Sequence, residues 1–190
     1  MPDIVIETER LILRKIEESD AALQYELLNT PAVMECLGGV KELHEIEAKH
    51  AKSMSWFARE GFGFMMLIEK STGELVGHCG MKRVDNPLAP NVGDHEIGWL
   101  VREDRWRHGY ANESMCAVID WAFDSIGVPY LVAITSERNE ASWRFMEKLG
   151  MERRKDLDFD DPAYDPRDNP AIQYSLSREQ WETEKCSGPA

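Results

Sequence analysis

The sequence predicts an α+β domain, an α/β sandwich in which helices cover both faces of a mixed β-sheet. The chain has 190 residues, an ordinary size for one domain. Hydrophobic residues make up 43% and charged residues 30%, which is globular usage and excludes a fibre or a disordered acidic chain. The predicted elements follow the order β-α-α-β-β-β-α-β-α-β-β, with antiparallel strands early and β-α-β units late.

The first third of the chain predicts one strand and two helices. Residues 10–16 (RLILRKI) alternate as a strand does. A helix capped by Ser19 or Asp20 ends before Pro31, since proline cannot continue it. Residues 42–59 carry apolar side chains at helical spacing and predict a second helix, which ends at Gly61.

The middle of the chain predicts three strands. Residues 62–69 and 75–84 are apolar runs joined by Lys-Ser-Thr-Gly, which is typical of a hairpin turn. A loop containing two prolines and two asparagines follows at 85–91. Residues 94–102 (DHEIGWLVR) predict the third strand.

The C-terminal half begins with the clearest helix. After Gly109, apolar residues recur at i, i+3, i+4, i+7, i+8 and i+11 until Gly127. Residues 130–135 predict a strand, and Asn139 caps a further helix. Residues 151–159 and 171–176 predict two strands around an acidic, proline-containing loop. We therefore expect seven strands in one domain, residues 1–182, followed by a frayed tail, residues 183–190.

Charge and cysteine content narrow the function. The net charge of −13 argues against nucleic acid and anionic membranes as partners, because binding to either needs a basic surface. An acidic domain still binds a polyphosphate where a helix N-terminus and a few arginines supply positive charge. Neither a signal peptide nor a membrane span is recognisable. The cysteines form no metal-binding or disulfide motif, which indicates reduced thiols in a cytoplasmic protein without metal. They are Cys36, Cys79, Cys116 and Cys186.

The segment before the long helix has the composition of a phosphate site. A strand leads through a glycine-bearing turn into a helix N-terminus, where backbone N–H groups lack partners. Gly109 and Ala111 allow close approach of an anion, while Arg105, Arg107 and His108 add positive charge. An ordinary left-handed turn before a helix is the alternative interpretation. The segment matches neither GxxxxGK[ST] nor GxGxxG, which weighs against a nucleotide-binding α/β protein.

Five ordered segments add a resemblance to a known family. WRHGYANE resembles the acyl-CoA pyrophosphate loop of the GNAT superfamily of N-acyltransferases, and NEASWRFMEKLGM resembles that superfamily's next helix. ETERLILR, EIGWLV and the ending from DFDDPAY to IQYSL are similar to the branch of RimJ/RimL-type ribosomal protein N-acetyltransferases. The resemblance runs from Thr8 to Trp181. It implies a GNAT-like, mostly antiparallel seven-stranded sheet and acetyl-CoA as co-substrate.

The resemblance also implies which residues contact acetyl-CoA. Backbone groups would pair with the pantetheine arm at Trp99, Leu100 and Val101, and backbone N–H groups would hold the pyrophosphate at Arg107, His108, Gly109, Tyr110, Ala111 and Asn112. Asn139 and Ser142 would lie near the thioester. The chain departs from the family where Trp106 replaces Gln or Arg, where Arg107 replaces glycine, and where Met146 replaces a tyrosine that many members use as the acid.

Transfer to an amine requires an uncharged nucleophile and stabilisation of the developing charge. Glu96 is the candidate general base, because it matches a glutamate that several GNAT enzymes use. His95 is the alternative, and strand alternation places the two on opposite faces without settling which face adjoins the substrate. Ser142 is the candidate group near the thiolate. A solvated Glu96 and a Ser142 bonded to its own helix are the non-catalytic alternatives.

The leading hypothesis is an acetyl-CoA-dependent N-acetyltransferase in which a primary amine attacks directly in a ternary complex. The acceptor is a protein N-terminal α-amine or a small-molecule amine. A catalytically silent acyl-CoA-binding domain is the main alternative, motivated by Met146. The sequence leaves open the acceptor, the acyl-chain preference and the choice between monomer and homodimer.

Overall fold

A computed structural model describes residues 3–186. The chain forms two compact units. Unit 1 contains the chain up to Lys82 together with Gly98–Ile126, and unit 2 contains Arg83–Ile97 together with the chain from Gly127 onward. The single domain expected over residues 1–182 stays a prediction. None of the described helices is both long enough and apolar enough to cross a membrane.

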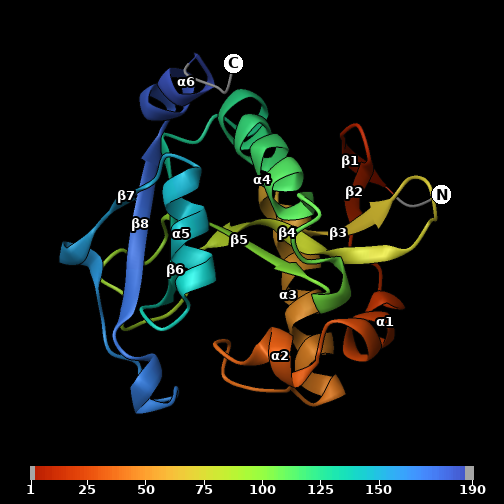
Figure 1. Cartoon of the computed structure of the whole chain (residues 1–190), viewed down its shortest axis with the longest axis horizontal. Coiled ribbons are helices and arrows are strands. Elements are labelled where there is room, and N and C mark those ends of the chain that lie inside the picture. Colours follow the sequence, from red (N-terminus) through yellow and green to blue (C-terminus); the bar gives the residue numbers. More distant parts are fainter. Residues whose placement is uncertain (1–2, 187–190) are drawn as a thin grey trace. The chain divides into compact units, whose positions relative to one another are not determined.

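Unit 1 combines most of the first five strands with the helices and helical turns up to Ile126 (Figure 1). Its strands are β1 (Ile4–Glu7), β2 (Leu11–Lys15), β3 (Phe64–Glu69) and β4 (Leu75–Arg83), whose last residue belongs to unit 2. Its helices are α1 (Asp20–Leu27), α2 (Pro31–Met34), α3 (Leu43–Glu60), the 3₁₀ turn η1 (Glu103–Arg105), α4 (Tyr110–Trp121) and the π-helical turn η2 (Ala122–Ile126). Strand β5 (His95–Val101) begins in unit 2 and ends in unit 1.

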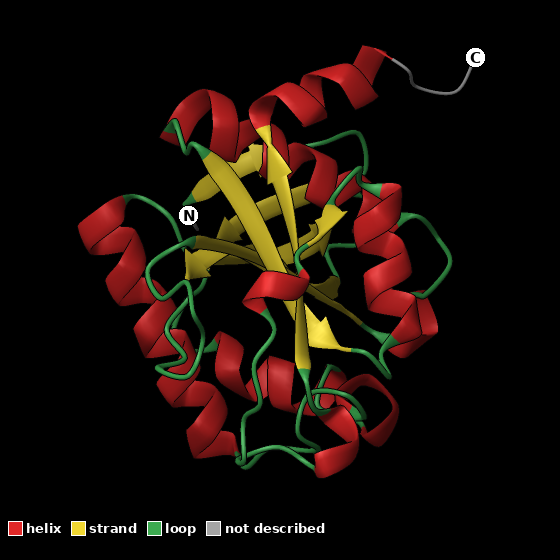
Figure 2. Ribbon diagram, turned by 90° about the vertical axis from the view of Figure 1, so that its left-hand side faces the viewer, coloured by secondary structure: helices red, strands yellow, loops and turns green. Residues whose placement is uncertain are grey.

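Unit 2 contains the remaining elements. They are β6 (Tyr130–Ser136), α5 (Glu140–Lys148), β7 (Glu152–Arg153), the 3₁₀ turns η3 (Lys155–Leu157) and η4 (Pro166–Asp168), β8 (Ala171–Ser177) and α6 (Arg178–Cys186). The long strands β6 and β8 lie side by side and are antiparallel over their full length (Figure 2).

Strand pairing gives one sheet of eight strands in the order β1-β2-β3-β4-β5-β6-β8-β7. Pairing is antiparallel for β1–β2, β2–β3, β3–β4, β6–β8 and β7–β8, and parallel for β5–β6. The prediction of a mixed, mostly antiparallel α+β fold is confirmed, with eight strands rather than seven. The additional strand is β1. It could not be predicted from the sequence because its four residues are too few to show alternation, and in the structure its first residue, Ile4, is 50% exposed.

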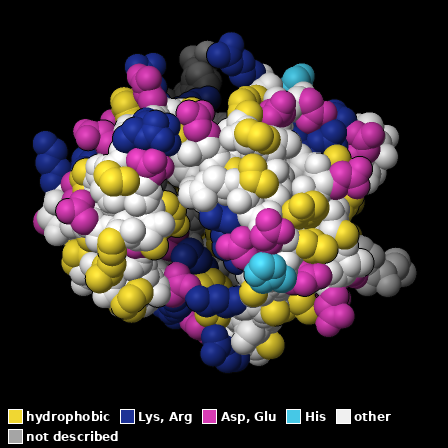
Figure 3. Space-filling view, turned by 90° about the horizontal axis from the view of Figure 1, so that it is seen from below, with side chains coloured by type: hydrophobic (Ala, Val, Ile, Leu, Met, Phe, Trp, Pro, Cys, Tyr) yellow, Lys and Arg dark blue, Asp and Glu magenta, His cyan; other side chains and the backbone are white. Residues whose placement is uncertain are grey.

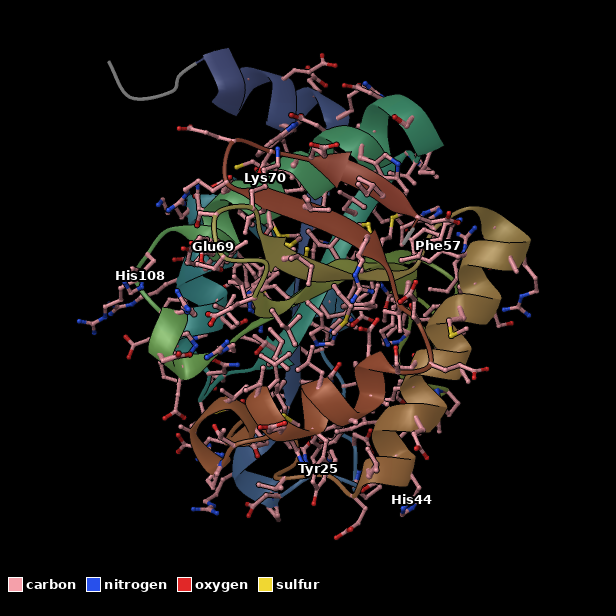
Figure 4. The ribbon with its side chains drawn as sticks, turned by 90° about the vertical axis from the view of Figure 1, so that its right-hand side faces the viewer. Tyr25, His44, Phe57, Glu69, Lys70 and His108 are labelled. Atoms are coloured by element: carbon pink, nitrogen blue, oxygen red, sulfur yellow. The ribbon has the colours of Figure 1, made fainter. Side chains whose placement is uncertain are left out.

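Helices cover both faces of the unit 1 strands, as predicted. One buried cluster joins Leu28, which follows α1, to Met66 on β3, with Met54 of α3 and Leu100 of β5 packed against it. Helix α4 contacts β1 and β2, and Figure 4 shows it on the other side of these strands from α1 and α3. Burial of these side chains is the main stabilising contribution to the unit.

Local chemistry accounts for the ends of α3. Glu42 and Glu45 form a reciprocal capping box, in which the Glu42 N–H donates to Glu45 Oε2 over 2.8 Å. The helix ends at Gly61, which has a left-handed φ of 78°. The predicted helix over residues 42–59 therefore matches Leu43–Glu60 closely.

The predicted strand over residues 151–159 is wrong in length, since β7 ends at Arg153. Arg153 forms a fork with Asp158 over 2.7 and 2.6 Å, and Arg154 forms a fork with Asp156 over 2.9 and 2.7 Å. These local ion pairs favour the turn η3 over an extended chain. Helix α6 continues to Cys186 and so includes the start of the predicted tail, whose residues 187–190 lie outside the described residues.

Candidate functional site

The loop between β5 and α4 is an irregular turn that ends in a helix N-terminus. The Trp106 indole Nε1 donates to the Val101 carbonyl over 2.8 Å and fixes the start of the loop. Arg107 has a φ of 63°, and among the described residues it is the one non-glycine with a positive φ. Gly109 follows with a φ of 82°. Two left-handed residues, separated by His108, thus precede α4.

The N-terminus of α4 has no side-chain cap. Its N-cap residue is Gly109, and the Glu113 N–H donates to the Gly109 carbonyl over 3.0 Å. The N–H groups of Tyr110, Ala111 and Asn112 precede this bond and have no intrahelical acceptor. Left-handed residues beside such donors form a concave anion site, and the helix dipole adds positive potential. The predicted anion site rests on these donors, and binding of an anion to them stays a prediction.

Positive charge at the loop comes from fewer residues than the sequence suggested. Arg105 forms ion pairs with Glu69, over 3.5 Å, and with Glu74, so its charge is compensated. Arg107 is exposed and forms no ion pair within the described part of the chain. On the face drawn in Figure 3, acidic side chains lie among the lysines and arginines. Because such mixed charges largely cancel, an anion site needs an uncompensated cation close by, such as Arg107. His108 is also exposed, and its Nδ1 lies 2.9 Å from the Trp106 carbonyl oxygen.

A buried contact supports the first residue of α4. Tyr110 is 6% exposed, and its hydroxyl donates to the Glu69 carboxylate, which also accepts from Thr72 Oγ1 over 2.9 Å. The hydrogen bond between Tyr110 and Glu69 raises the pKa of the tyrosine and lowers the pKa of the carboxyl group. Figure 4 shows Glu69 and His108 on the same side of unit 1. The sequence alone gives no signal for Glu69, since 41 residues separate it from its partner.

The predicted pantetheine contacts lie at the end of β5, directly before the loop. Leu100 packs into the unit 1 core, and Val101 is 8% exposed. The Val101 carbonyl already accepts from Trp106, so one acceptor position of that group is used within the chain. Trp99 is half-buried. The pairing of these three backbone segments with pantetheine stays a prediction.

The two candidate bases lie at the start of β5, within unit 2. Glu96 is half-buried and lies opposite Val132 in the parallel pairing with β6. Leu100 on the same strand packs with the α1 and α3 cluster, and alternation assigns Glu96 to that face and His95 to the opposite face. Which of the two faces adjoins the substrate stays a prediction, as does the role of Glu96 as a base.

The other predicted residues lie at α5, also in unit 2. Asn139 is the N-cap, and its side-chain oxygen accepts the Ser142 N–H over 3.3 Å, which confirms the predicted cap. Ser142 is half-buried, and its hydroxyl has no hydrogen bond within the described residues. Met146 is 1% exposed and belongs to the core, so it supplies neither a proton nor a contact at the surface.

The structure brings the six predicted loop residues, 107–112, together within unit 1. Glu96, Asn139 and Ser142 belong to unit 2. Among residues 3–186 no group of three or more His, Cys, Asp or Glu side chains has an arrangement that would hold a metal ion.

Comparison with known proteins identifies the family. The model of the acetyltransferase (GNAT) domain family matches residues 10–152. YkkB, an uncharacterized Bacillus subtilis protein, is 31% identical over 79% of this chain and 86% of its own. The uncharacterized N-acetyltransferase YoaA of the same organism is 30% identical over 78% and 83%. An Agrobacterium tumefaciens acetyltransferase structure is similar with a TM-score of 0.76 and 27% identity, covering 91% and 94%. The chain belongs to the GNAT acetyltransferase family.

Proposed function

We propose that the protein is an N-acetyltransferase that transfers an acetyl group from acetyl-CoA to a primary amine. The loop geometry carries this proposal, because Arg107 and the uncapped N–H groups of Tyr110, Ala111 and Asn112 suit a pyrophosphate. Family membership supports the acyl-transfer chemistry. The acceptor proposed is a protein N-terminal α-amine or a small-molecule amine, as the resemblance to the RimJ/RimL branch implies.

The chain's residues divide the work in the following way. The loop binds the pyrophosphate, and the backbone at Trp99, Leu100 and Val101 orients the pantetheine arm. Glu96 takes a proton from the amine, directly or through water, because a protonated amine has no lone pair for attack. Ser142, whose hydroxyl has no partner among the described residues, hydrogen-bonds near the departing thiolate. The amine and thioester react directly, with no covalent enzyme intermediate.

A silent acyl-CoA-binding domain is the second candidate. One observation favours it, since Met146 is buried at the position where many family members have a tyrosine acid. Such a domain would bind acetyl-CoA at the same loop and would not turn it over.

Thermal unfolding with acetyl-CoA tests the binding half of the proposal. At about 100 times the dissociation constant, a ligand stabilises the folded state by about 2.7 kcal/mol, or a few degrees for a chain of this size. We expect this shift with acetyl-CoA and not with ATP or pantetheine at the same concentration. Equal shifts with ATP, or none with acetyl-CoA, would contradict the proposal.

CoA release with a panel of amines tests the catalytic half. We expect turnover with at least one N-terminal peptide or small amine, and a loss of about 10²-fold or more in kcat for Glu96→Gln. His95→Gln is the matched variant, because it changes the neighbouring residue on the opposite face of β5. Tight binding without turnover by any variant would establish the silent binder instead.

The proposal includes a cytoplasmic location. Cys36, Cys79 and Cys116 are free thiols, which suits a reducing compartment. The expectation that no metal and no nucleic acid take part belongs to the same proposal, and both the monomer and the homodimer agree with it.

A further inference from the structure

We propose that Arg10, in the turn between β1 and β2, is a positioning residue for acetyl-CoA: it fixes the His108 carbonyl and neutralises Glu113, so that the loop donors face the pyrophosphate. This inference rests on the proposed function. Arg10 lies 98 positions before the loop residue that it contacts, so the sequence alone gives it no role in the site.

The contacts of Arg10 converge on the start of α4. Its Nη1 donates to the His108 carbonyl over 2.9 Å, and its Nε donates to Glu113 Oε2 over 2.6 Å. The Arg10 backbone N–H donates to Glu113 Oε1 over 2.8 Å. The guanidinium also lies over the Tyr110 ring, 4.6 Å from its centroid. One side chain thus contacts the loop, the first residue of the helix and its first turn.

The bond to His108 acts on the orientation of one peptide group. In a trans peptide the carbonyl of one residue and the N–H of the next point in opposite directions. The His108 carbonyl and the Gly109 N–H belong to one such peptide group. It joins His108 to Gly109, and both Arg107 and Gly109 are left-handed. Holding the carbonyl toward Arg10 therefore directs the Gly109 N–H to the other side and keeps a partial negative charge away from the bound anion.

The bond to Glu113 acts on charge. Glu113 is the fourth residue of α4, one turn from the uncapped donors, and an unpaired carboxylate there would repel a pyrophosphate. Arg10 and the Thr8 hydroxyl both donate to this carboxylate. Burial by itself raises the pKa of Glu113, but these hydrogen bonds outweigh it and lower the pKa, so the carboxylate is ionised and compensated.

The position of the guanidinium makes the effect specific to the pyrophosphate. A Cβ on Gly109 would lie 3.4 Å from Arg10 Nη2, so the charge lies directly beside the loop glycine. Acetyl-pantetheine lacks the pyrophosphate and does not need this part of the loop. Loss of Arg10 should therefore weaken acetyl-CoA binding and leave acetyl-pantetheine binding unchanged.

The test is calorimetric titration of Arg10→Ala, Arg10→Lys and wild type with acetyl-CoA and with acetyl-pantetheine. Arg154→Ala is the matched control, since Arg154 also donates to a carboxylate, has a similarly exposed side chain (39% against 43%) and lies outside the loop. Thermal unfolding without ligand shows that each variant is folded.

We expect Arg10→Ala to weaken acetyl-CoA binding about tenfold or more, the equivalent of one charge-assisted hydrogen bond. Arg10→Lys should recover part of the loss, because it restores the charge but not both hydrogen bonds of the guanidinium, to Glu113 and to the His108 carbonyl. Arg154→Ala should bind as wild type does. Unchanged acetyl-CoA binding by Arg10→Ala, or an equal loss for both ligands, would overturn the positioning role. Failure of wild type itself to bind acetyl-CoA would overturn the proposed function instead.

If Arg10→Ala does not fold, Arg10→Lys decides the matter by the same ratio of the two affinities. A selective loss for acetyl-CoA supports the role, and wild-type affinity for both ligands overturns it.

Discussion

The N-termini of α4 and α5 differ in how their first backbone N–H groups are capped. Each follows a strand, α5 after a short turn and α4 after a longer loop that contains η1. At α5 the Asn139 side chain accepts the Ser142 N–H, and Glu140 in the first turn pairs with Arg144. At α4 the N-cap residue is Gly109, which has no side chain that could accept a hydrogen bond. Two residues earlier, the backbone of Arg107 is strained because its φ is positive.

This difference separates a structural terminus from a binding terminus. A side-chain cap satisfies a donor within the chain and stabilises the helix by about 1 kcal/mol. An uncapped terminus gives up that contribution and leaves its donors for a ligand. The chain compensates at α4 with contacts from outside the helix, through Glu69 and Arg10.

The largest effect should come from closing the α4 terminus with Gly109→Val. A β-branched residue at a φ of 82° is strained, and its Cβ would lie 3.4 Å from Arg10 Nη2, where it would disturb the guanidinium that holds the His108 carbonyl. We expect acetyl-CoA affinity to fall on the order of tenfold or more, measured by titration calorimetry.

Gly61→Val is the control for this change. Gly61 has a similar φ of 78°, and nothing lies within 4 Å of its Cβ position. It should lose comparable stability and retain wild-type affinity. Equal loss of affinity in both variants would mean that the α4 terminus has no special role.

The next effect concerns the hydrogen bond between Tyr110 and Glu69 and the dependence of its contribution to stability on pH. Tyr110→Phe removes the donor to Glu69 and should lower the free energy of unfolding at pH 7. The folded-state pKa of Glu69 lies below its usual value of about 4.3, so this contribution is present above about 4.3 and is lost as pH falls through the folded pKa. Urea unfolding of both proteins between pH 7 and 3 measures this. A difference that stays constant down to pH 3 would refute the link to Glu69.

A smaller effect is expected at the α5 terminus. Asn139→Ala should cost about 1 kcal/mol of stability, and Asn139→Ser should retain most of it because serine also caps. The cap does not titrate, so the loss should be the same at pH 7 and pH 4, in contrast to Tyr110→Phe. Chemical denaturation gives both numbers, and an undiminished stability for Asn139→Ala would show that the cap contributes nothing.

The smallest effect should come from Arg107→Gly. Glycine adopts a φ of 63° without strain, so the protein should become more stable, by up to about 1 kcal/mol. Loss of the exposed cation should lower acetyl-CoA affinity severalfold at low salt, and less at high salt because ions screen the charge. Affinity that is independent of salt in both proteins would argue against a contact between Arg107 and an anion.

Periodic segments could be predicted from the sequence, and short or charged ones could not. The regular spacing in α3 and α4 and the cap at Asn139 predicted helices whose bounds the structure reproduces within a few residues. The helix α2 and the strand β1 have four residues each and are too short to show a period. The ion pairs of Arg153 and Arg154 turn a predicted strand into η3, because pairing depends on side chains that periodicity ignores.

The same limit holds for the site. Gly109 and the turn around it were visible because a glycine before an amphipathic helix is a local pattern. Arg10 and Glu69 were not, because their contacts join residues 98 and 41 positions apart. The sequence also suggested that Arg105 adds positive charge to the site, whereas its ion pairs with Glu69 and Glu74 compensate that charge.

The most direct test of the account is to follow the backbone amides themselves during titration with acetyl-CoA, using ¹⁵N-resolved NMR. We predict that the amides of residues 107–112 shift more than that of Glu45, which belongs to a helix terminus capped within the chain. We also predict that acetyl-pantetheine leaves the loop amides unmoved. Binding of acetyl-CoA without a shift at residues 107–112 would contradict the claim that the uncapped terminus of α4 holds the pyrophosphate.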